Sequence, residues 1–499
     1  MGLGEAYIVG LDSGTQSAKA CVWDLAGRPV SRAKRPLAVR NPREGWAEQD
    51  PEEWWESARG VLSEAVSGLD PSRIRALGVA FQRETFTLFD KAGRPLRPGI
   101  LWLDIRAREE VREIAASLGA RAFHEATGKP LDVTSALARM LWIRKNEPDA
   151  LRAAARWVDV GAFLMERLTG SFTTCVAGAD TCGLIGLKTR KWDHALIDPA
   201  GLPPSAFPAL AEPGQVVGRI TPRAAEQCGL PAGLPVVAAG GDGQVLSVGL
   251  GEGAARGFSL TLGTSVVLGL PRGDAPISGL YRTLISADSR SRLLLESVIQ
   301  SGTFLLRWFV DRFHGSEEDI RAIPPGCDGL VTMPHWWGVR FPESAPDARG
   351  AVIGWSHTHT AAHFYRSLLE GIAFELARLS KEYERLFDDI AGAGITACGG
   401  GARSQEWLRI LADVLGRTVS IPREQESTAL GAAMLAGLGI GEFKSIEEAA
   451  GFMSRILRSF LPDTRMNARY KEIFEKIYLP LVSASLPLTS ELSRLAGAS

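Results

Sequence analysis

The chain has 499 residues, of which 45% are hydrophobic and 23% charged, and its formal net charge is −1. This length exceeds the usual size of one hydrophobic core, so we expect two or more domains. The sequence has no basic run for nucleic acid, and no apolar stretch approaches the ~20 residues that span a bilayer. Because the N-terminus leads directly into a predicted strand, without a signal region, we expect a cytoplasmic protein whose cysteines are reduced.

The first predicted strand, residues 7–12, ends in a turn rich in glycine and hydroxyl residues. Asp12 lies at the strand end, where a carboxylate is costly unless it is paired, hydrogen-bonded or bound to a metal. Gly14 permits a tight turn, and backbone N–H groups beside the Thr15 hydroxyl suit phosphate oxygens. We therefore predict magnesium near Asp12 and phosphate at the turn. The alternative is a plain hairpin with a surface aspartate.

Hydrophobic periodicity predicts the next elements of the first half. Residues 51–68 repeat with a helical period, and Pro51 suits the first helical turn. Residues 170–235 are polar and rich in turn residues. The predicted strands are 18–24, 28–39, 77–81 and 86–89, and the predicted helices are 51–68, 105–118 and 133–147.

Two polar segments interrupt the apolar pattern of the first half. Residues 82–85, Gln-Arg-Glu-Thr, lie between two predicted strands, where buried polar groups need partners. Their amide, guanidinium and carboxylate groups suit vicinal hydroxyls, since they both donate and accept hydrogen bonds. Trp102, Asp104 and Arg106 combine an aromatic plane with a carboxylate and a guanidinium. The segments predict a sugar or polyol site, and internal salt bridges are the alternative.

An aspartate follows the last predicted strand of the first half. Gly240 and Gly241 precede Asp242, and the flanking glycines would let this carboxylate approach a ligand and accept a proton from a hydroxyl. An ordinary β-turn aspartate is the alternative.

The second half, which begins near Val248, repeats the early pattern. Residues 258–262 form a predicted strand that ends in Gly263-Thr264-Ser265, a turn related to the one after Asp12. Two such turns predict two domains that close on a nucleotide from opposite sides. Further predicted elements are strands at 265–270, 292–298 and 395–398, a long helix at 361–387, a glycine turn at 399–401, a helix capped by Ser404 and a helical tail beyond about 460.

Several other enzyme and site classes are excluded by spacing. The sequence contains no Gly-x-x-x-x-Gly-Lys-Ser/Thr run, so it is not a P-loop enzyme. The turn at 399–401 lacks the Gly-x-Gly-x-x-Gly spacing of a dinucleotide site. His357, His359 and His363 lie near a predicted helix start, where we expect surface or capping roles, and we predict no zinc site.

Taken together and in this order, these segments resemble the FGGY family of carbohydrate kinases almost from end to end. Residues 10–19 and 262–265 are similar to the two phosphate motifs of the family, and 240–242 to the segment with its catalytic aspartate. Residues 399–404 are similar to its adenosine motif. Segments 45–51 and 426–437 also match the family, whereas 363–374 only approximates the region of the signature that names it.

The resemblance implies an α/β fold with two actin-like, ribonuclease-H-type ATPase domains and a nucleotide and sugar cleft between them. The implied division is a sugar- and phosphate-binding domain at 1–247, a nucleotide-binding domain at 248–460 and a helical tail, packed on the kinase domains, at 461–499. It also implies ATP and Mg²⁺ as cofactors, and Asp242 as general base toward a sugar or polyol hydroxyl.

The resemblance assigns further residues by position. Acceptor binding falls to Gln82, Arg83, Glu84, Trp102, Asp104 and Asp242, and Mg²⁺ binding to Asp12 and Asp242. ATP binding falls to Gly14, Thr15, Gln16, Lys19, Gly263, Thr264, Gly302, Gly400, Gly401, Ala402 and Gln405.

The acceptor remains open at this point. Residues 82–85 resemble the glycerol-binding segment of glycerol kinases, but 132–134 lack the aromatic residue found there. Residues 240–249 and 401–404 look more like xylulokinases, which carry Met-His-Gly where this chain has Gln-Arg-Glu. A pentulose such as xylulose is the first expectation and glycerol the second. A non-metabolic actin-like ATPase and a sensor without catalysis are the rival classes. The resemblance is also compatible with a homodimer.

Overall fold

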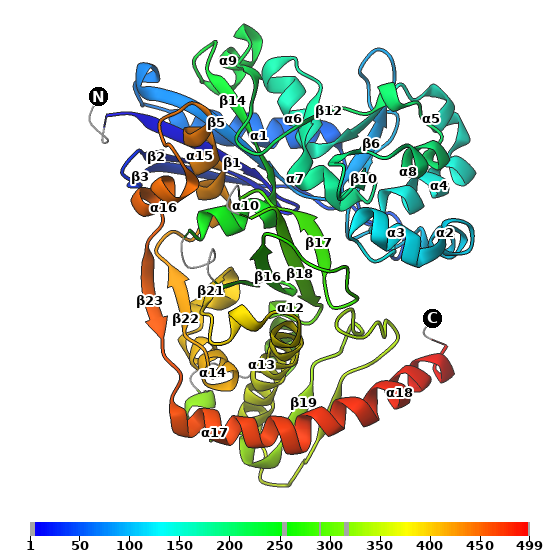
Figure 1. Ribbon diagram of the computed structural model, residues 1–499, viewed down its shortest axis with the longest axis vertical. Coiled ribbons are helices and arrows are strands. Elements are labelled where there is room, and N and C mark those ends of the chain that lie inside the picture. Colours follow the sequence, from blue (N-terminus) through cyan, green and yellow to red (C-terminus); the bar gives the residue numbers. More distant parts are fainter. Residues whose placement is uncertain (1–4, 252–256, 289–290, 314–318, 498–499) are drawn as a thin grey trace.

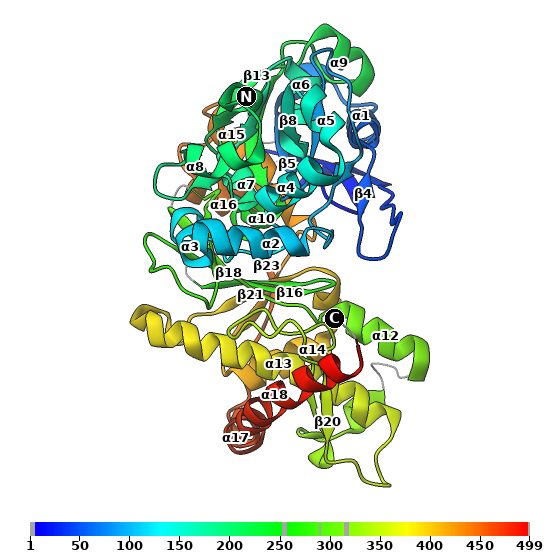
Figure 2. The same ribbon diagram turned by 90° about the vertical axis from the view of Figure 1, so that its right-hand side faces the viewer.

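The computed structural model describes residues 5–251, 257–288, 291–313 and 319–497. Two α/β halves are stacked along the long axis, and each is built around one large sheet (Figures 1 and 2). The first half fills the upper part of both views, and the second half fills the lower part.

The central strands of the first sheet are almost entirely apolar and buried, which suits strands covered on both faces. β1 pairs with β2 in antiparallel register and with β5 in parallel register, and β5 pairs in parallel with β14. The sheet has the order β13-β14-β5-β1-β2-β3, with β1 (Tyr7–Ser13), β2 (Ser17–Asp24), β3 (Pro29–Pro36), β5 (Ile74–Phe81), β13 (Val216–Arg219) and β14 (Pro235–Gly241).

The second sheet repeats this arrangement, as the related turns predict. β15 pairs with β16 in antiparallel register and with β21 in parallel register, and β21 pairs in parallel with β22. The sheet has the order β17-β18-β16-β15-β21-β22-β23, with β15 (Phe258–Leu262), β16 (Val266–Arg272), β17 (Arg282–Ile285), β18 (Leu293–Ile299), β21 (Ile395–Cys398), β22 (Val419–Pro422) and β23 (Ile456–Phe460).

A smaller sheet with the order β4-β7-β6-β8 extends the first half to one side and has its own apolar core. Its strands are β4 (Glu48–Gln49), β6 (Phe86–Phe89), β7 (Gly99–Ile100) and β8 (Arg156–Asp159). Two-stranded pairs are formed by β9 (Thr173–Cys175) with β12 (Ala209–Ala211), by β10 (Ile185–Gly186) with β11 (Lys191–Trp192), and by β19 (Val331–Met333) with β20 (Ala351–Ile353).

The helices cover the sheets. Those of the first half are α1 (Pro51–Val66), α2 (Arg108–Ile114), α3 (Ala120–Thr127), α4 (Ala136–Asn146), α5 (Pro148–Ala153), α6 (Val160–Thr169), α7 (Val176–Ala179), α8 (His194–Ile197), α9 (Pro222–Cys228) and α10 (Asp242–Gly249). Those that follow are α12 (Thr303–Phe313), α13 (Ala361–Leu386), α14 (Gln405–Leu415), α15 (Ser427–Gly439), α16 (Ile446–Met453), α17 (Thr464–Ile473) and α18 (Leu479–Leu495).

Two predicted helices differ from the observed ones by more than two residues at an end. The helix predicted at 105–118 is divided: α2 ends at Ile114, a π-helical turn spans Ala115–Gly119, and α3 follows. The helix predicted at 133–147 begins at Ala136. The predicted cap is confirmed, since the Ser404 side chain accepts a hydrogen bond from the Trp407 N–H at the start of α14.

The chain crosses between the halves near its end. After β22 it leaves the second sheet, and α15 and α16 pack on the first sheet, whose core cluster they join. β23 then returns to the second sheet (Figure 1). Helices α10 and α15 lie against each other where the halves meet. A Cβ atom at Gly249 would lie 1.8 Å from the Ser427 carbonyl oxygen, so only glycine permits this close approach.

Candidate active site

The parallel strands of the first sheet bring three predicted site residues to one edge. β1, β5 and β14 end there together, because parallel strands share their carboxyl edge. Asp12 lies near the end of β1, Arg83 follows β5, and Asp242 follows β14. Their side chains therefore line one cavity of about 350 Å³ although they are far apart in the sequence.

This cavity, which we call the central cavity, has walls from both halves. The second half contributes the turn after β15 and charged side chains of β17, β18 and a later loop. The predicted site residues that line it are Asp12, Gly14, Thr15, Arg83, Glu84, Trp102, Asp242, Gly263 and Thr264.

The two glycine–threonine turns have related backbone geometry. The Gly14 N–H donates to the Ser17 carbonyl at 3.1 Å, and the Gly263 N–H donates to the Ser265 carbonyl, also at 3.1 Å. Each turn joins the first two strands of its sheet. Trp102, which is 37% exposed, donates its indole N–H to the Thr15 hydroxyl at 2.8 Å. The cavity thus has a hydroxyl-bearing turn on each side and an aromatic plane at one of them.

Asp12 is a buried carboxylate without a full set of partners. It is 8% exposed, and its Oδ1 atom has no hydrogen-bond partner. Burial raises the pKa of Asp12 to about 7. Lys19 lies opposite Asp12 in the β1–β2 register, and its positive charge opposes this rise. The negative charge of Asp242 adds to the rise. Lys19 also forms an ion pair with Glu426 at 2.6 Å. A charged Asp12 would be stabilised by a cation in the cavity.

Asp242 is the first residue of α10 and directs its carboxylate toward Arg83. Its Oδ1 atom accepts a hydrogen bond from the Gly243 N–H at 2.8 Å and lies 3.2 Å from Arg83 Nε. Burial raises the pKa of Asp242, and the charge of Arg83 opposes this effect. Gly241 leaves the space that Arg83 fills, since a Cβ there would lie 2.6 Å from Arg83 Cγ. The glycines therefore place a guanidinium beside the carboxylate.

Arg83 and Glu84 of the first half are held by two charged residues of the second half. Arg83 Nη1 donates to Glu296 at 3.0 Å, and Arg282 forms ion pairs with both Glu296 and Glu84. Glu84 has a φ of 58°, in the left-handed region that costs a side-chain-bearing residue on the order of 1–3 kcal/mol. We call this chain of four residues the ionic clasp. It fixes the strained Glu84 and joins the two halves beside Asp242.

A second ion pair joins the halves at the same cavity. Arg340, which lines the cavity, pairs with Asp132 of the first half. Burial would raise the pKa of Asp132, but the charge of Arg340 and hydrogen bonds from Thr134 lower it below its usual range. Asp132 belongs to the segment that lacks the aromatic residue of glycerol kinases, so a charged pair occupies this region.

Arg282, Glu296 and Arg340 were not among the predicted site residues. One signal was available for Glu296, which interrupts the apolar run Leu-Leu-Leu-Glu-Ser-Val-Ile of β18. A carboxylate in such a strand needs a buried partner. Nothing comparable marks Arg340, which lies outside the helices and strands.

Several residues that were predicted to bind the nucleotide line a separate cavity of about 660 Å³, which we call the glycine-turn cavity. It is lined by Lys19 on the first-half side and by Gly400, Ala402 and Gln405 on the second-half side. Gly401 is buried behind it, against Trp407 and Leu262. Gly302 lies behind the second glycine–threonine turn, where its N–H donates to the Thr264 carbonyl at 3.0 Å.

Besides Gly302 and Gly401, three predicted residues lie outside the lining of both cavities. The Gln82 amide donates to the Gln49 side chain at 2.9 Å. Asp104 is fully buried, pairs with Arg106 at 2.6 Å and accepts the Ala47 N–H at 2.7 Å. Gln16 is exposed at the tip of the first turn. These contacts place Gln82 and Asp104 in the wall that supports the central cavity.

The donor set limits the kind of metal that fits. Across residues 5–251, 257–288, 291–313 and 319–497, no three His, Cys, Asp or Glu side chains are grouped to hold a metal ion. Asp12 and Asp242 nevertheless line one cavity, and the Asp12 carboxylate has an unpartnered oxygen. Two carboxylates fit Mg²⁺, which keeps several waters and takes phosphate oxygens as its other ligands.

Comparisons with known proteins agree with this architecture. The models for the N-terminal and C-terminal domains of the FGGY family of carbohydrate kinases match residues 7–249 and 258–440, respectively. Glycerol kinase of Nocardia farcinica is 31% identical over 468 residues, covering 89% of this chain and 92% of the relative. Xylulose kinase of Escherichia coli is 29% identical over 490 residues, covering 95% of this chain and 100% of the relative.

Solved structures share the fold. Xylulose kinase of Rhodospirillum rubrum superposes with a TM-score of 0.89 at 27% identity, covering 97% of this chain and 99% of that one. Gluconate kinase of Lactobacillus acidophilus superposes with a TM-score of 0.90 at 22% identity, covering 98% and 99%. The helices within the described ranges include none that combines the length and apolar character needed to cross a bilayer.

Proposed function

Because the chain belongs to the FGGY family of carbohydrate kinases, and so is an ATP-dependent kinase of a small sugar or polyol, we propose a pentulose such as xylulose as its acceptor. We also propose Asp242 as its general base. One observation carries the proposal. The central cavity holds both glycine–threonine turns, Asp242 and the polar cluster of Arg83, Glu84 and Trp102.

The residues around Asp242 support its role in the transfer step. An acceptor oxygen attacks the γ-phosphorus, the bond from that phosphorus to the bridging oxygen breaks, and ADP leaves. The acceptor proton passes to the Asp242 carboxylate, which Arg83 at 3.2 Å helps to keep ionised until then. Gly14, Thr15, Gly263 and Thr264 would donate hydrogen bonds to the β- and γ-phosphates, and Lys19 would add positive charge.

Asp12 and Asp242 would hold Mg²⁺ through water, and the ion would supply charge neutralisation at the phosphates. On the nucleotide side, we propose that Gly400, Gly401, Ala402 and Gln405 bind the adenosine, with Gly302 behind the phosphate turn and Gln16 at the tip of the first turn. These roles agree with the position of the glycine-turn cavity, which Lys19 and Gly400 both line.

The number of polar groups favours a pentulose over glycerol. Besides Trp102, the cavity wall carries Arg83 and Glu84 from one half and Arg282, Glu296 and Arg340 from the other. The ionic clasp and the Arg340–Asp132 pair use most of these groups, but the buried Arg282 Nε has no hydrogen-bond partner. An acceptor with more than three hydroxyls offers such remaining donors more partners than glycerol does. The similarity to xylulose kinases over nearly the whole chain also supports this choice.

Glycerol is the second candidate acceptor. The Gln-Arg-Glu-Thr segment at 82–85 and the 31% identity to a glycerol kinase favour it. The test is ADP release by purified protein with Mg-ATP across pentuloses, hexuloses, aldonates, tetritols and glycerol. A pentulose with the highest kcat/KM is the expected result. Preferred turnover of glycerol would replace the proposal with the second candidate, and ATP hydrolysis that no acceptor stimulates would contradict both.

Arg83→Ala is expected to raise KM for the acceptor by about 10–100-fold, while KM for ATP changes by less than about threefold. Hydrogen bonds to a charged group contribute about 1.5–3 kcal/mol, which corresponds to this range. Steady-state kinetics with each substrate varied in turn measure the effect. Arg121→Ala, at a side chain that is 92% exposed on α3, is the matched control. Equal increases in both KM values would place Arg83 outside the acceptor site.

Asp12→Asn is expected to stabilise the metal-free protein increasingly as the pH rises from about 4 to about 7. The folded-state pKa of Asp12, about 7, lies above the usual 3.8, so the folded protein retains a proton that the unfolded chain has lost. Stability of the parent protein therefore falls as the pH rises through this window, whereas asparagine carries no charge. Thermal unfolding in EDTA measures the difference between the two midpoints.

Added Mg-ATP should reverse the order of the two proteins at pH 8, because Asp12 would then have its cation. Asp198→Asn, an exposed aspartate remote from the cavity, controls for loss of a surface charge. A difference in midpoint that is constant between pH 4 and pH 8 would contradict the assignment of Asp12. The division at residue 247 and the homodimer stay predictions, which limited proteolysis and the mass in solution would test.

A further inference from the structure

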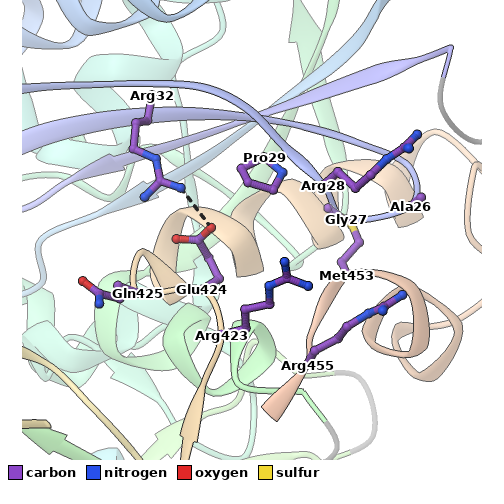
Figure 3. A pocket seen from close by; sticks show the side chains of 10 residues that line it. All are labelled: Ala26, Gly27, Arg28, Pro29, Arg32, Arg423, Glu424, Gln425, Met453 and Arg455. Atoms are coloured by element: carbon purple, nitrogen blue, oxygen red, sulfur yellow. Dashed lines mark hydrogen bonds and ion pairs between the residues drawn. The ribbon is translucent and has the colours of Figure 1, made fainter. Parts of the chain in front are cut away.

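A large cavity lies on the side of the molecule where the chain crosses between the halves. It has a volume of about 740 Å³, and we call it the crossing cavity. One wall is the β2–β3 turn, the second is the segment between β22 and α15, and the third is the segment between α16 and β23 (Figure 3). Three segments that are far apart in sequence therefore form a single concave surface.

The lining of the crossing cavity is strongly basic. Arg28 comes from the β2–β3 turn and Arg32 from β3, and Arg423 and Arg455 come from the two crossing segments. Glu424 is the one acidic side chain of the lining, which leaves the cavity with a net charge of +3 from its lining residues. Asp24, outside the lining, pairs with the Arg28 guanidinium at 2.6 Å and accepts the Arg28 backbone N–H at 2.9 Å. At least two positive charges of the lining are therefore uncompensated.

The four guanidinium groups differ in how well they are paired. Arg32 lies 3.5 Å from Glu424, at the long limit of a hydrogen bond. Over the described part of the chain, the side chains of Arg423 and Arg455 form no hydrogen bond or ion pair. Figure 3 shows the Arg423 guanidinium in the middle of the group, with Arg28 and Arg455 on one side and Glu424 and Arg32 on the other. Two planar donors thus remain available to a ligand.

The backbone holds these two free arginines next to each other. The Arg423 N–H donates to the Arg455 carbonyl at 2.7 Å, which joins the outgoing and returning crossing segments. An anion that enters the cavity would be attracted by the positive charge of both side chains. Guanidinium groups bind phosphate through paired N–H donors, and such charge-assisted bonds are the strong ones.

The crossing cavity is separate from the proposed active site. It shares no lining residue with the central cavity, and it shares only Gln425 with the glycine-turn cavity. Neither Arg423 nor Arg455 lines either of those two cavities. The reaction proposed above therefore leaves this basic surface without a role.

We propose that the crossing cavity binds a small anion that carries two linked phosphate groups. The volume and the walls on three sides suit a small molecule better than a nucleic acid, which a long open basic face would bind. One phosphate group would lie between Arg423 and Arg455, and the other would reach Arg32, which the 3.5 Å contact with Glu424 holds only weakly. The anion would bridge the first sheet and the two crossing segments.

Titration calorimetry with inorganic pyrophosphate tests the proposal. The double variant Arg423→Ala/Arg455→Ala is expected to lose one class of binding site, or to bind at this site at least about tenfold more weakly, since each charged hydrogen bond contributes about 1.5–3 kcal/mol. Its kcat and its KM for ATP are expected to equal those of the parent protein. This result would assign the lost site to the crossing cavity, and any pyrophosphate binding that remains would belong to the phosphate turns.

A matched double variant, Arg121→Ala/Arg152→Ala, removes the same charge from exposed positions elsewhere and should bind pyrophosphate as the parent does. Identical titrations of the parent and of Arg423→Ala/Arg455→Ala would overturn the proposal. Equal affinity for citrate would overturn the selectivity for phosphate. Tight binding of a single-stranded oligonucleotide, without binding of pyrophosphate, would overturn the small-molecule assignment.

Discussion

Asp242→Asn is expected to lower kcat by about 10²–10⁴-fold, the usual contribution of a general base, while the affinity for nucleotide changes little. Asparagine keeps the shape of the side chain and its position at the start of α10, but it does not accept a proton. The contact of Arg83 Nε with this side chain, at 3.2 Å, also survives in part, because the amide oxygen accepts a hydrogen bond.

Single-turnover phosphoryl transfer and binding of ATP, measured separately, distinguish this role from a role in metal binding. Loss of the general base slows transfer at saturating Mg²⁺, whereas loss of a metal ligand is compensated when the Mg²⁺ concentration is raised. Asp198→Asn serves as the matched control. Turnover within a few-fold of the parent would remove Asp242 from the chemical step.

Glu296→Gln is expected to destabilise the folded protein by about 3–5 kcal/mol, because it leaves two buried guanidinium groups short of a partner. The Glu296 carboxylate is 3% exposed and pairs with both Arg83 and Arg282. The change would also loosen Glu84, which Arg282 holds at a φ of 58°. Thermal unfolding measures the loss, and Glu491→Gln in the exposed pair with Arg494 should leave the midpoint unchanged.

The pH dependence of this loss has a defined sign. Burial would raise the pKa of Glu296, but the charges of Arg83 and Arg282 lower it to about 2 from its usual 4.5. A lowered pKa contributes stability that is complete above pH 4.5 and is lost as the pH falls toward 2. The difference between parent and variant should therefore be constant above pH 4.5 and shrink below it. A difference that grows in acid would contradict the clasp.

The ionic clasp also bears on how the halves move. Phosphoryl transfer needs a site from which water is excluded, and the halves of such an enzyme close around their substrates. The clasp joins Arg83 and Glu84 of the first half to Arg282 and Glu296 of the second at the base of the cavity. Arg340 and Asp132 form a further link beside it. Weakening these links is thus expected to affect acceptor binding as well as stability.

The sequence by itself determined the repeated architecture and the carboxylates of the central cavity. The turns at Gly14 and Gly263 follow buried apolar strands, and both patterns are local, so they can be read without knowing any tertiary contact. Asp12 and Asp242 could be selected in the same way, because a carboxylate at the end of a buried strand loses solvation unless it is paired, hydrogen-bonded or bound to a metal. Strand ends that share one edge then bring them together.

Only the tertiary structure decided which charged groups meet in the cavity. Arg282 and Glu84 are 198 residues apart in the sequence, and they pair because the edge of the second sheet lies against the first half. Asp104 and Arg106 resembled the other polar residues in sequence, yet they turn into the supporting wall and pair with each other. Which face a side chain occupies depends on the register and packing of distant strands, and a composition pattern does not encode that choice.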